Sequence, residues 1–329
     1  MSPNGEPWLI IGQGLAGTCL AWEFLGRNEP FKIIDRGFGG SSRVAAGLLN
    51  PITGKNFEPS WRITDFYTES IDFYLRVERQ LAHQLWYPLP ILRLASSDKE
   101  WSKIAAKLEL PQTARWIADT SPDHPDGFVA AVELTGGGRI DTANFIKLSA
   151  TFFTERGLLE IGDHRGSPSG GRYILCEGAS GLIENQIGQH RCAKGEILTV
   201  KSNWPETHIR IGSGGWLVPI GNNLFRVGST YEWNHLTEYP TATGQERILN
   251  IARILGGSHF EIVDHVAGIR PILRRSQPLL GKNQNNDWIF NALGSKGTLY
   301  APKFATMLAD WILEGIEPNE DFILGSHFD

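Results

Sequence analysis

Residues 8–35 read WLIIGQGLAGTCLAWEFLGRNEPFKIID: an apolar run, a glycine-rich turn, an apolar-periodic segment and a second apolar run. The two apolar runs, 8–12 and 31–35, are typical of short buried strands. The segment between them has the spacing of a helix with one apolar face. The residues on that face are Leu15, Cys19, Leu20 and Phe24. The chain is therefore expected to begin with a strand, a glycine-rich turn, a helix and a second strand.

The glycines of the turn, Gly12, Gly14 and Gly17, have the spacing G-x-G-x-x-G. In such a turn the first glycine permits the bend, the second lets a phosphate approach the backbone, and the third lets helix and strand pack closely. A pyrophosphate would lie at the helix N-terminus, where free N–H groups and the helix dipole favour an anion. Asp35, which ends the second run, could accept hydrogen bonds from ribose hydroxyls and disfavours a 2′-phosphate. The segment predicts dinucleotide binding; the alternative is a glycine-rich loop in an unrelated α/β domain.

The composition is that of an ordinary globular protein. The chain has 329 residues, of which 41% are hydrophobic, enough for two domains or one elaborate domain. A net charge of −5 gives no reason to expect a nucleic-acid or anionic-membrane partner. The three cysteines are scattered and the nine histidines form no close pairs, so we expect neither a disulfide framework nor a metal site. Without a visible secretory signal, we expect a cytoplasmic protein.

The next segment, GSSRVAAGLLNPITGK (40–55), consists mostly of small side chains. An NAD-binding domain usually continues with simple strand–helix repeats. A run of Gly, Ala and Ser can instead lie flat against a large planar ligand, with its N–H groups facing phosphate and ring atoms. Here the chain resembles the FAD-dependent D-amino-acid oxidase superfamily, in particular its glycine oxidase and sarcosine oxidase branch. In that family, Ser-Ser-Arg followed by Ala-Ala-Gly lines the pyrophosphate and the flavin ring.

Further motifs of the family follow in its order along the chain. The similar segments are GGRIDTANFIKLSATFFTERG (137–157), with Asp141 or Thr142 as the helix N-cap, RYILCEGASG (172–181), KGEILTV (194–200), the expected hairpin GGWLVPIGNNLFRVGSTYEW (214–233), VAGIRPILRRSQPLLG (266–281) and NALGSKGTLYAPKFATMLADWI (291–312). Coverage is weakest over 58–136. The resemblance implies an α/β fold in which a Rossmann-type FAD-binding domain is interleaved with a mostly antiparallel β-sheet substrate domain. The FAD-binding domain would comprise 1–80, 138–195 and 266–329, and the substrate domain 81–137 and 196–265.

The resemblance also implies which residues contact FAD. They are Gly12, Gly14, Leu15, Ala16, Gly17, Asp35, Arg36, Ser41, Ser42, Arg43, Ala45, Ala46, Gly47, Leu48, Gly178, Gly294, Ser295, Lys296, Gly297, Thr298 and Leu299. We expect the FAD to be noncovalent, because the chain has no His before His83 and no Cys after Cys192, where some relatives attach the flavin.

Three residues are predicted to act on the substrate side. Arg270 stands where the family places the arginine that binds the substrate carboxylate, a group that arginine can hold in bidentate fashion; otherwise it braces a strand end. Trp216 replaces a common tyrosine, and either contacts substrate or packs on the sheet. Lys296 stabilises the reduced flavin if its ammonium faces the ring, and is a solvated loop charge if it faces water. Asn50, Lys55, Arg62, Tyr231 and Tyr300 are further pocket candidates without a motif.

The leading functional hypothesis is an FAD-dependent oxidoreductase that takes a hydride from a C–N bond of an amino acid or amine. The resulting imine would hydrolyse, and the electrons would pass to oxygen or another acceptor. Within the superfamily, a tailoring or tRNA-modifying oxidase is an alternative, which the acidic pI of about 6.0 disfavours. The remaining alternatives are a flavin-binding protein without turnover and an NAD-dependent reductase. Substrate identity, electron acceptor and oligomeric state are left open.

Overall fold

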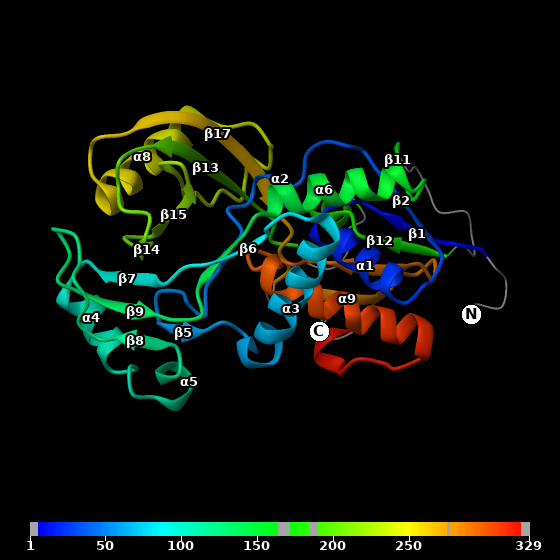
Figure 1. Ribbon diagram of the computed structural model, residues 1–329, viewed down its shortest axis with the longest axis horizontal. Helices are drawn as coiled ribbons and strands as arrows, with labels where there is room; N and C mark the ends of the chain where they lie inside the picture. Colours follow the sequence, from blue (N-terminus) through cyan, green and yellow to red (C-terminus); the bar gives the residue numbers. More distant parts are fainter. Residues whose placement is uncertain (1–5, 164–171, 185–189, 275–276, 324–329) are drawn as a thin grey trace.

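In the computed structural model, which describes residues 6–163, 172–184, 190–274 and 277–323, the chain passes back and forth between two large β-sheets (Figure 1). One sheet has six strands in the order β11-β2-β1-β12-β19-β18, and the other has eight in the order β17-β13-β16-β15-β14-β7-β9-β8. The first carries helices on its faces, and the second extends away from it to form the other end of the molecule. The architecture is mixed α/β, as predicted.

The six-stranded sheet is built around the β-α-β unit expected at the start of the chain. Its strands run parallel except for β18, which is antiparallel to β19. The strands are β1 (Trp8–Ile11), β2 (Phe31–Asp35), β11 (Leu159–Ile161), β12 (Tyr173–Leu175), β18 (Leu279–Lys282) and β19 (Trp288–Asn291). Parallel sheets of this kind are covered by helices, which here are α1 (Leu15–Gly26), α6 (Thr142–Glu155) and α9 (Gly297–Glu314).

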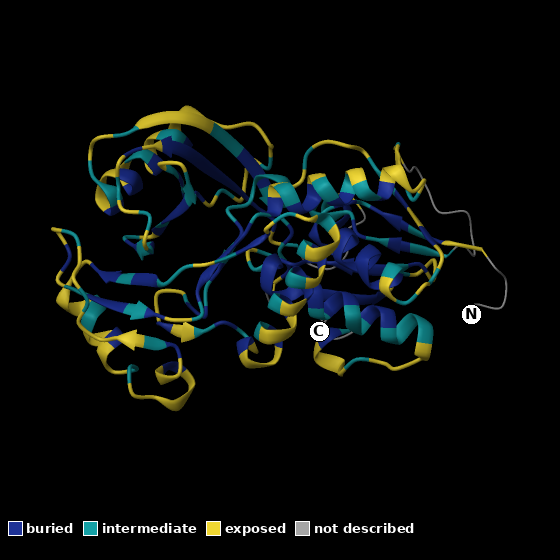
Figure 2. Cartoon of the chain, in the orientation of Figure 1, coloured by how far each residue is buried: buried dark blue, intermediate teal, exposed yellow. Residues whose placement is uncertain are grey.

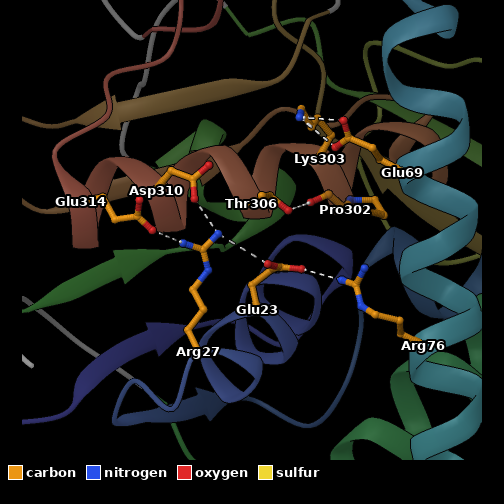
Figure 3. Close-up of polar contacts among 9 residues, drawn as sticks. All are labelled: Glu23, Arg27, Glu69, Arg76, Pro302, Lys303, Thr306, Asp310 and Glu314. Atoms are coloured by element: carbon orange, nitrogen blue, oxygen red, sulfur yellow. Dashed lines mark hydrogen bonds and ion pairs between the residues drawn. The ribbon is translucent and has the colours of Figure 1, made fainter.

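Helix α1 differs from the expected helix with a single apolar face. Every residue from Leu15 to Phe24 is buried, because α9 and α6 pack against the sides of α1 that do not face the sheet. Figure 3 shows the polar contacts that hold α1 to α9 and to α3 (Ile63–Leu81). Arg27 donates to Asp310 at 2.6 Å, and Arg76 of α3 donates to Glu23 at 2.9 Å.

The eight-stranded sheet is antiparallel except for the parallel pair β14–β7. Helix α8 (Ala242–Gly256) packs on one of its faces, against β13, β15 and β16. The expected hairpin is confirmed: Asn222 and Asn223 make its turn with φ of 58° and 60°, values typical of a type I′ turn. The strands are β7 (Ile91–Ala95), β8 (Ile117–Asp119), β9 (Ala130–Leu134), β13 (Ala193–Lys201), β14 (Ile209–Gly212), β15 (Gly215–Gly221), β16 (Leu224–Gly228) and β17 (Glu261–Arg270).

Shorter elements complete the fold. Strands β3, β10 and β6 form a three-stranded sheet, and β4 and β5 form a small ribbon. These elements are α2 (Ser41–Val44), β3 (Leu48–Leu49), β4 (Ile52–Thr53), β5 (Glu58–Pro59), β6 (Trp86–Pro88), α4 (Asp98–Ala105), α5 (Pro111–Ala114), β10 (Gly138–Ile140), α7 (Gly178–Glu184) and the 3₁₀ turn η1 (Glu320–Phe322). The N-cap of α6 is Asp141, whose Oδ1 accepts from the N–H of Asn144 at 3.1 Å.

Buried residues are concentrated in the strands and on the inward faces of the helices, as Figure 2 shows. Strands β13 and β17 cross the predicted boundaries at 195/196 and 265/266, and both lie in the eight-stranded sheet along their whole length. The division into domains stays a prediction. Residues 275–276 of the 266–281 motif lie outside the described residues. No helix within the described ranges is long and apolar enough to cross a membrane.

Candidate active site

A cavity of about 2970 Å³ lies between the turns of the six-stranded sheet and one face of the eight-stranded sheet. Sites for a single small ligand usually measure about 300–1000 Å³. The cavity therefore has room for a dinucleotide cofactor and a substrate together.

The glycine-rich turn is shaped by close backbone approaches. Gly12 has a φ of 100°, and a Cβ atom there would lie 2.6 Å from the carbonyl oxygen of Cys176, which directly follows the neighbouring strand β12. A Cβ at Gly17 would collide with the carbonyl oxygen of Gly12, so α1 lies closely against β1. Gly14 faces the cavity at the N-terminus of α1 and provides no side-chain cap. The turn thus presents the helix N-terminus to the cavity, as a pyrophosphate site requires.

Asp35 is fixed where β2 ends at the cavity. Its carboxylate accepts from the N–H groups of Gln13 and Gly37, each at 2.7 Å. It also forms an ion pair with Arg43, whose Nη2 lies 2.7 Å away. The predicted acid and the predicted arginine are thereby held beside the glycine-rich turn, to which Gln13 belongs.

The segment 40–55 begins with one helical turn, α2. The turn lies against β17, because a Cβ at Gly268 would be 2.7 Å from a methyl group of Val44. The hydroxyl of Ser42 accepts from the N–H of Leu15 at 3.0 Å, and so ties α2 to the first residue of α1. A Cβ at Gly47 would collide with the carbonyl oxygen of Ile140 in β10, so the segment is closely approached by backbone at that end as well.

Arg270 ends β17 inside the cavity. Its Nη2 donates to the hydroxyl of Ser229 at 2.7 Å and its Nη1 to the carbonyl of Thr230 at 3.2 Å. The guanidinium carbon lies 4.1 Å from the ring centroid of Tyr231, a cation–π arrangement. Burial lowers the pKa of Arg270 from that of a free guanidinium. Among the described residues no carboxylate pairs with it, which leaves a partly buried cation in the cavity wall, suited to an anionic ligand.

Trp216 lies on β15 directly opposite Gly228 of β16. A Cβ at Gly228 would lie 2.8 Å from Cζ2 of the indole, so the ring covers the glycine. The ring is also partly exposed to the cavity. Trp216 therefore packs on the sheet, which was one of its two predicted roles. It also reaches the cavity, so contact with a substrate stays a prediction.

Lys296 precedes α9 in the turn Gly294-Ser295-Lys296-Gly297. Its ammonium donates to the hydroxyl of Thr53 at 3.0 Å, and burial lowers its pKa. The ammonium is thus drawn into the cavity wall and away from bulk water. The N–H of Gly294 donates to the carbonyl of Pro271 at 2.9 Å, which ties this turn to the residue after Arg270.

The predicted site residues converge on this one cavity, although their individual roles stay predictions. All of them line it except Gly17, which packs behind the turn. Of the candidates without a motif, Asn50, Lys55, Tyr231 and Tyr300 line the cavity, whereas Arg62 pairs with Asp65 elsewhere. The sequence reasoning did not single out Thr53, Ser229 and Arg93, three polar residues of the lining. The first two lie inside quoted motifs, and Arg93 lies in PILRLASS (90–97), a weak hint of the family within 58–136, where coverage is weakest.

A glycine-rich turn and a partly buried arginine that line one large cavity are typical of a cofactor-dependent enzyme. The chain belongs to the FAD-dependent oxidoreductase family DAO, whose model matches residues 8–311. The predicted resemblance, the choice of FAD over NAD and the oxidoreductase class are thereby confirmed.

Several known proteins are similar to this chain. Glycine oxidase of Bacillus licheniformis is 28% identical over 343 residues, covering 93% of this chain and 92% of its own. The tRNA 5-methylaminomethyl-2-thiouridine biosynthesis bifunctional protein MnmC of Idiomarina loihiensis is 21% identical, covering 91% of this chain and 54% of its own. The chain thus spans about half the length of that bifunctional relative.

The fold prediction is confirmed by solved structures. Glycine oxidase from Geobacillus kaustophilus superimposes with a TM-score of 0.79 at 18% identity, covering 95% of both chains. Iminodiacetate oxidase from Chelativorans sp. BNC1 gives 0.76 at 19% identity, covering 95% of this chain and 96% of its own.

The residues of the cavity fit the FAD that the family uses. The close approaches at Gly12 and Gly17 leave the N-terminus of α1 open to a pyrophosphate. Asp35 is fixed at the end of β2, where an adenosine ribose would be expected. The small residues 45–47 and the 294–297 turn line the remainder, where backbone can approach a planar ring.

Proposed function

We propose that this enzyme oxidises an amino acid or amine at a C–N bond, with Arg270 holding the substrate carboxylate. The observation that carries the proposal is the isolated charge of Arg270. Its guanidinium is partly buried in the cavity wall and, among the described residues, is hydrogen-bonded only to the neutral groups of Ser229 and Thr230. A partly buried cation without a counterion is stabilised by a carboxylate, and the planar guanidinium matches that group.

The surrounding residues orient this cation. Ser229 and Thr230 hold the two terminal nitrogens, and the ring of Tyr231 lies over the guanidinium carbon. The remaining N–H groups can then face the cavity in a fixed direction, so a bound amino acid would be held by its carboxylate with its C–N bond in a defined place. FAD, when bound, supplies the hydride acceptor.

The cofactor-side residues would hold FAD without a covalent bond. The N-terminus of α1 and the segment 41–48 would contact the pyrophosphate and the ring, and Asp35 the ribose. Lys296 would place a positive charge near the ring, where negative charge develops during hydride transfer. Its bond to Thr53 holds that ammonium in the cavity wall.

Anaerobic flavin reduction tests the proposal. The FAD-loaded protein is mixed under nitrogen with glycine, sarcosine, both enantiomers of larger amino acids and simple secondary amines. At least one compound should bleach the oxidised flavin band, with release of the corresponding carbonyl product. If the loaded protein is yellow and correctly folded yet no compound in the panel bleaches it, amine oxidation is the wrong reaction.

A second candidate is oxidation of a modified nucleoside in tRNA. It is favoured by the similarity to MnmC over 91% of this chain. The net charge of −5 does not favour RNA binding. Mixing the FAD-loaded enzyme with unmodified and with modified tRNA distinguishes the two candidates. If modified tRNA bleaches the flavin and free amino acids do not, the substrate is a nucleoside in tRNA.

A further inference from the structure

A second arginine, Arg93, lines the same cavity from a strand of the eight-stranded sheet that is distant from the strand of Arg270. Arg93 of β7 is in register with Ile211 of β14, and Ile211 is in register with Trp216 of β15. Residues in register on neighbouring strands point to the same face of a sheet. All three side chains line the cavity, so they form one row across its wall.

Arg93 is held in place by one carboxylate. Its side chain is 11% exposed, and its Nη2 lies 3.0 Å from Oε1 of Glu100 in α4. The other oxygen of Glu100 accepts from the N–H and the hydroxyl of Ser96, at 3.0 and 2.9 Å. Glu100 is thus fixed on both sides, and among the described residues it is the only polar partner of Arg93. Nε and Nη1 of Arg93 remain as donors.

This end of the cavity is rich in positive charge although the whole chain has a net charge of −5. Lys99 and Lys103 of α4, both exposed, line the cavity beside Arg93, and Lys55 of the turn between β4 and β5 lines the same cavity. Of the residues 93–103, Glu100 alone contributes a carboxylate to the lining. Burial lowers the pKa of Arg93, while Glu100 opposes that shift. One carboxylate beside these cations leaves an excess of positive charge.

Arg93 and Arg270 are too far apart to bind the same small amino acid. In the strand order β17-β13-β16-β15-β14-β7, five steps separate the strand of Arg270 from the strand of Arg93. At about 4.8 Å per step the two strands are roughly 24 Å apart measured along the sheet, and the guanidinium of Arg270 reaches one strand inward, over Gly195 of β13. A molecule of the size of glycine held at Arg270 cannot reach Arg93. A ligand that contacts both must be elongated and must carry an anionic group at each end.

We propose that Arg93, with Lys99 and Lys103 at the rim, binds a second anionic group, a carboxylate or a phosphate, at the far end of an elongated amine substrate. This inference rests on the proposed function, because it assumes that Arg270 holds the near carboxylate. Trp216 lies between the two cations and would contact the middle of such a substrate. The enzyme would then select substrates by length and by distal charge.

A homologous series of N-alkylglycines tests the proposal. Members of increasing chain length end in a carboxylate, a phosphonate or a methyl group, and dissociation constants are measured on the FAD-loaded enzyme from the perturbation of the flavin spectrum. Beyond a threshold length, the anionic members should bind about tenfold or more tightly than the methyl members. The terminal group that gains most, carboxylate or phosphonate, identifies the chemistry of the distal anion.

Variants locate the effect. Arg93→Met should abolish the gain from distal charge and leave the methyl series unchanged, and Lys103→Met should reduce the gain. Lys201→Met is the matched control, because Lys201 is exposed at the end of β13 in the same sheet and does not line the cavity. Arg93→Met alone leaves the Glu100 carboxylate without its cation and could disturb folding. The double variant Arg93→Met/Glu100→Gln removes that unpaired charge and therefore provides a second test of the same gain.

The outcomes separate this inference from the proposed function. If sarcosine reduces the flavin but the anionic and methyl series bind equally at every length, the role of Arg93 is overturned and amine oxidation stands. A gain that survives in both Arg93 variants also overturns it. If no amine perturbs or reduces the flavin, the proposed function fails, and the elongated amine substrate fails with it.

Discussion

The guanidinium of Arg270 lies directly over the backbone of Gly195, with no room for a side chain between them. A Cβ atom at position 195 would collide with the terminal nitrogens and the central carbon of the guanidinium. The glycine belongs to the Lys-Gly-Glu motif of β13, whose neighbour in the sheet is β17. Gly195 in the 194–200 motif thus makes room for Arg270 of the 266–281 motif, the residue predicted to bind the substrate carboxylate.

The first prediction follows from that contact. Gly195→Ala should displace Arg270 and weaken the binding of carboxylate substrates by about tenfold or more. Amines without a carboxylate should be affected much less, and FAD should bind normally, because Gly195 lies away from the glycine-rich turn. Substrate dissociation constants and flavin content measure both effects. An equal loss for both kinds of substrate would show that Arg270 does not act on the carboxylate.

The second prediction concerns Gly17 and cofactor binding. Because a Cβ there would collide with the carbonyl oxygen of Gly12, Gly17→Ala should push α1 away from the turn and lower FAD affinity by at least tenfold. Gly26→Ala, at the end of the same helix, is the matched control, since its Cβ would meet nothing within 4 Å. If Gly17→Ala retains full FAD affinity, the close packing of α1 on the glycine-rich turn is not required for cofactor binding.

The third prediction is a pH dependence that arises from Lys296. Burial lowers its pKa, so its ammonium loses the proton at a lower pH than an exposed lysine does. If the positive charge promotes hydride transfer, the rate of anaerobic flavin reduction should fall as pH rises through that lowered pKa. Lys296→Met should be slower and should lack this alkaline decline, and Lys296→Arg should keep its rate to higher pH. An unchanged profile in both variants would exclude the role.

The fourth prediction is a stability effect of Glu23. Burial raises its pKa above 4.5, although Arg76 and Arg27 oppose the shift. A raised pKa means that the folded state favours the protonated acid, so this contribution to stability is present below pH 4.5 and declines as pH rises through the raised value. The free energy of unfolding of the wild type, relative to Glu23→Gln, should therefore decrease from acidic to neutral pH. Urea unfolding at several pH values measures it, and an increase would contradict the raised pKa.

Local features of the fold and of the cavity lining could be predicted from the sequence. Motif spacing identified the glycine-rich turn, Asp35 and the segment 40–48, which line the cavity, and the Asn222-Asn223 turn, which does not. The all-round burial of α1 was not predicted, because it depends on α9, which lies far along the chain.

Arg93 shows why the remainder of the site could not be predicted. Its place beside Ile211 and Trp216 arises from the register of β7 with β14 and of β14 with β15. Alternation along a strand does not reveal which face will meet a cavity until the pairing of distant strands is known. The hydrogen bond from Lys296 to Thr53 likewise joins residues that are 243 positions apart in the sequence, and no local pattern predicts it.

The most direct test of the role of Arg270 compares one amino acid with its carboxylate-free amine on wild type and Arg270→Met. The rate and affinity of anaerobic flavin reduction are measured for a substrate from the panel that bleaches the flavin, and for the amine that lacks only its carboxylate. We expect Arg270→Met to bind the amino acid about tenfold or more weakly, to bind the amine nearly as the wild type does and to retain FAD. If the amino acid binds and reduces the flavin equally well in both proteins, Arg270 does not hold the substrate carboxylate.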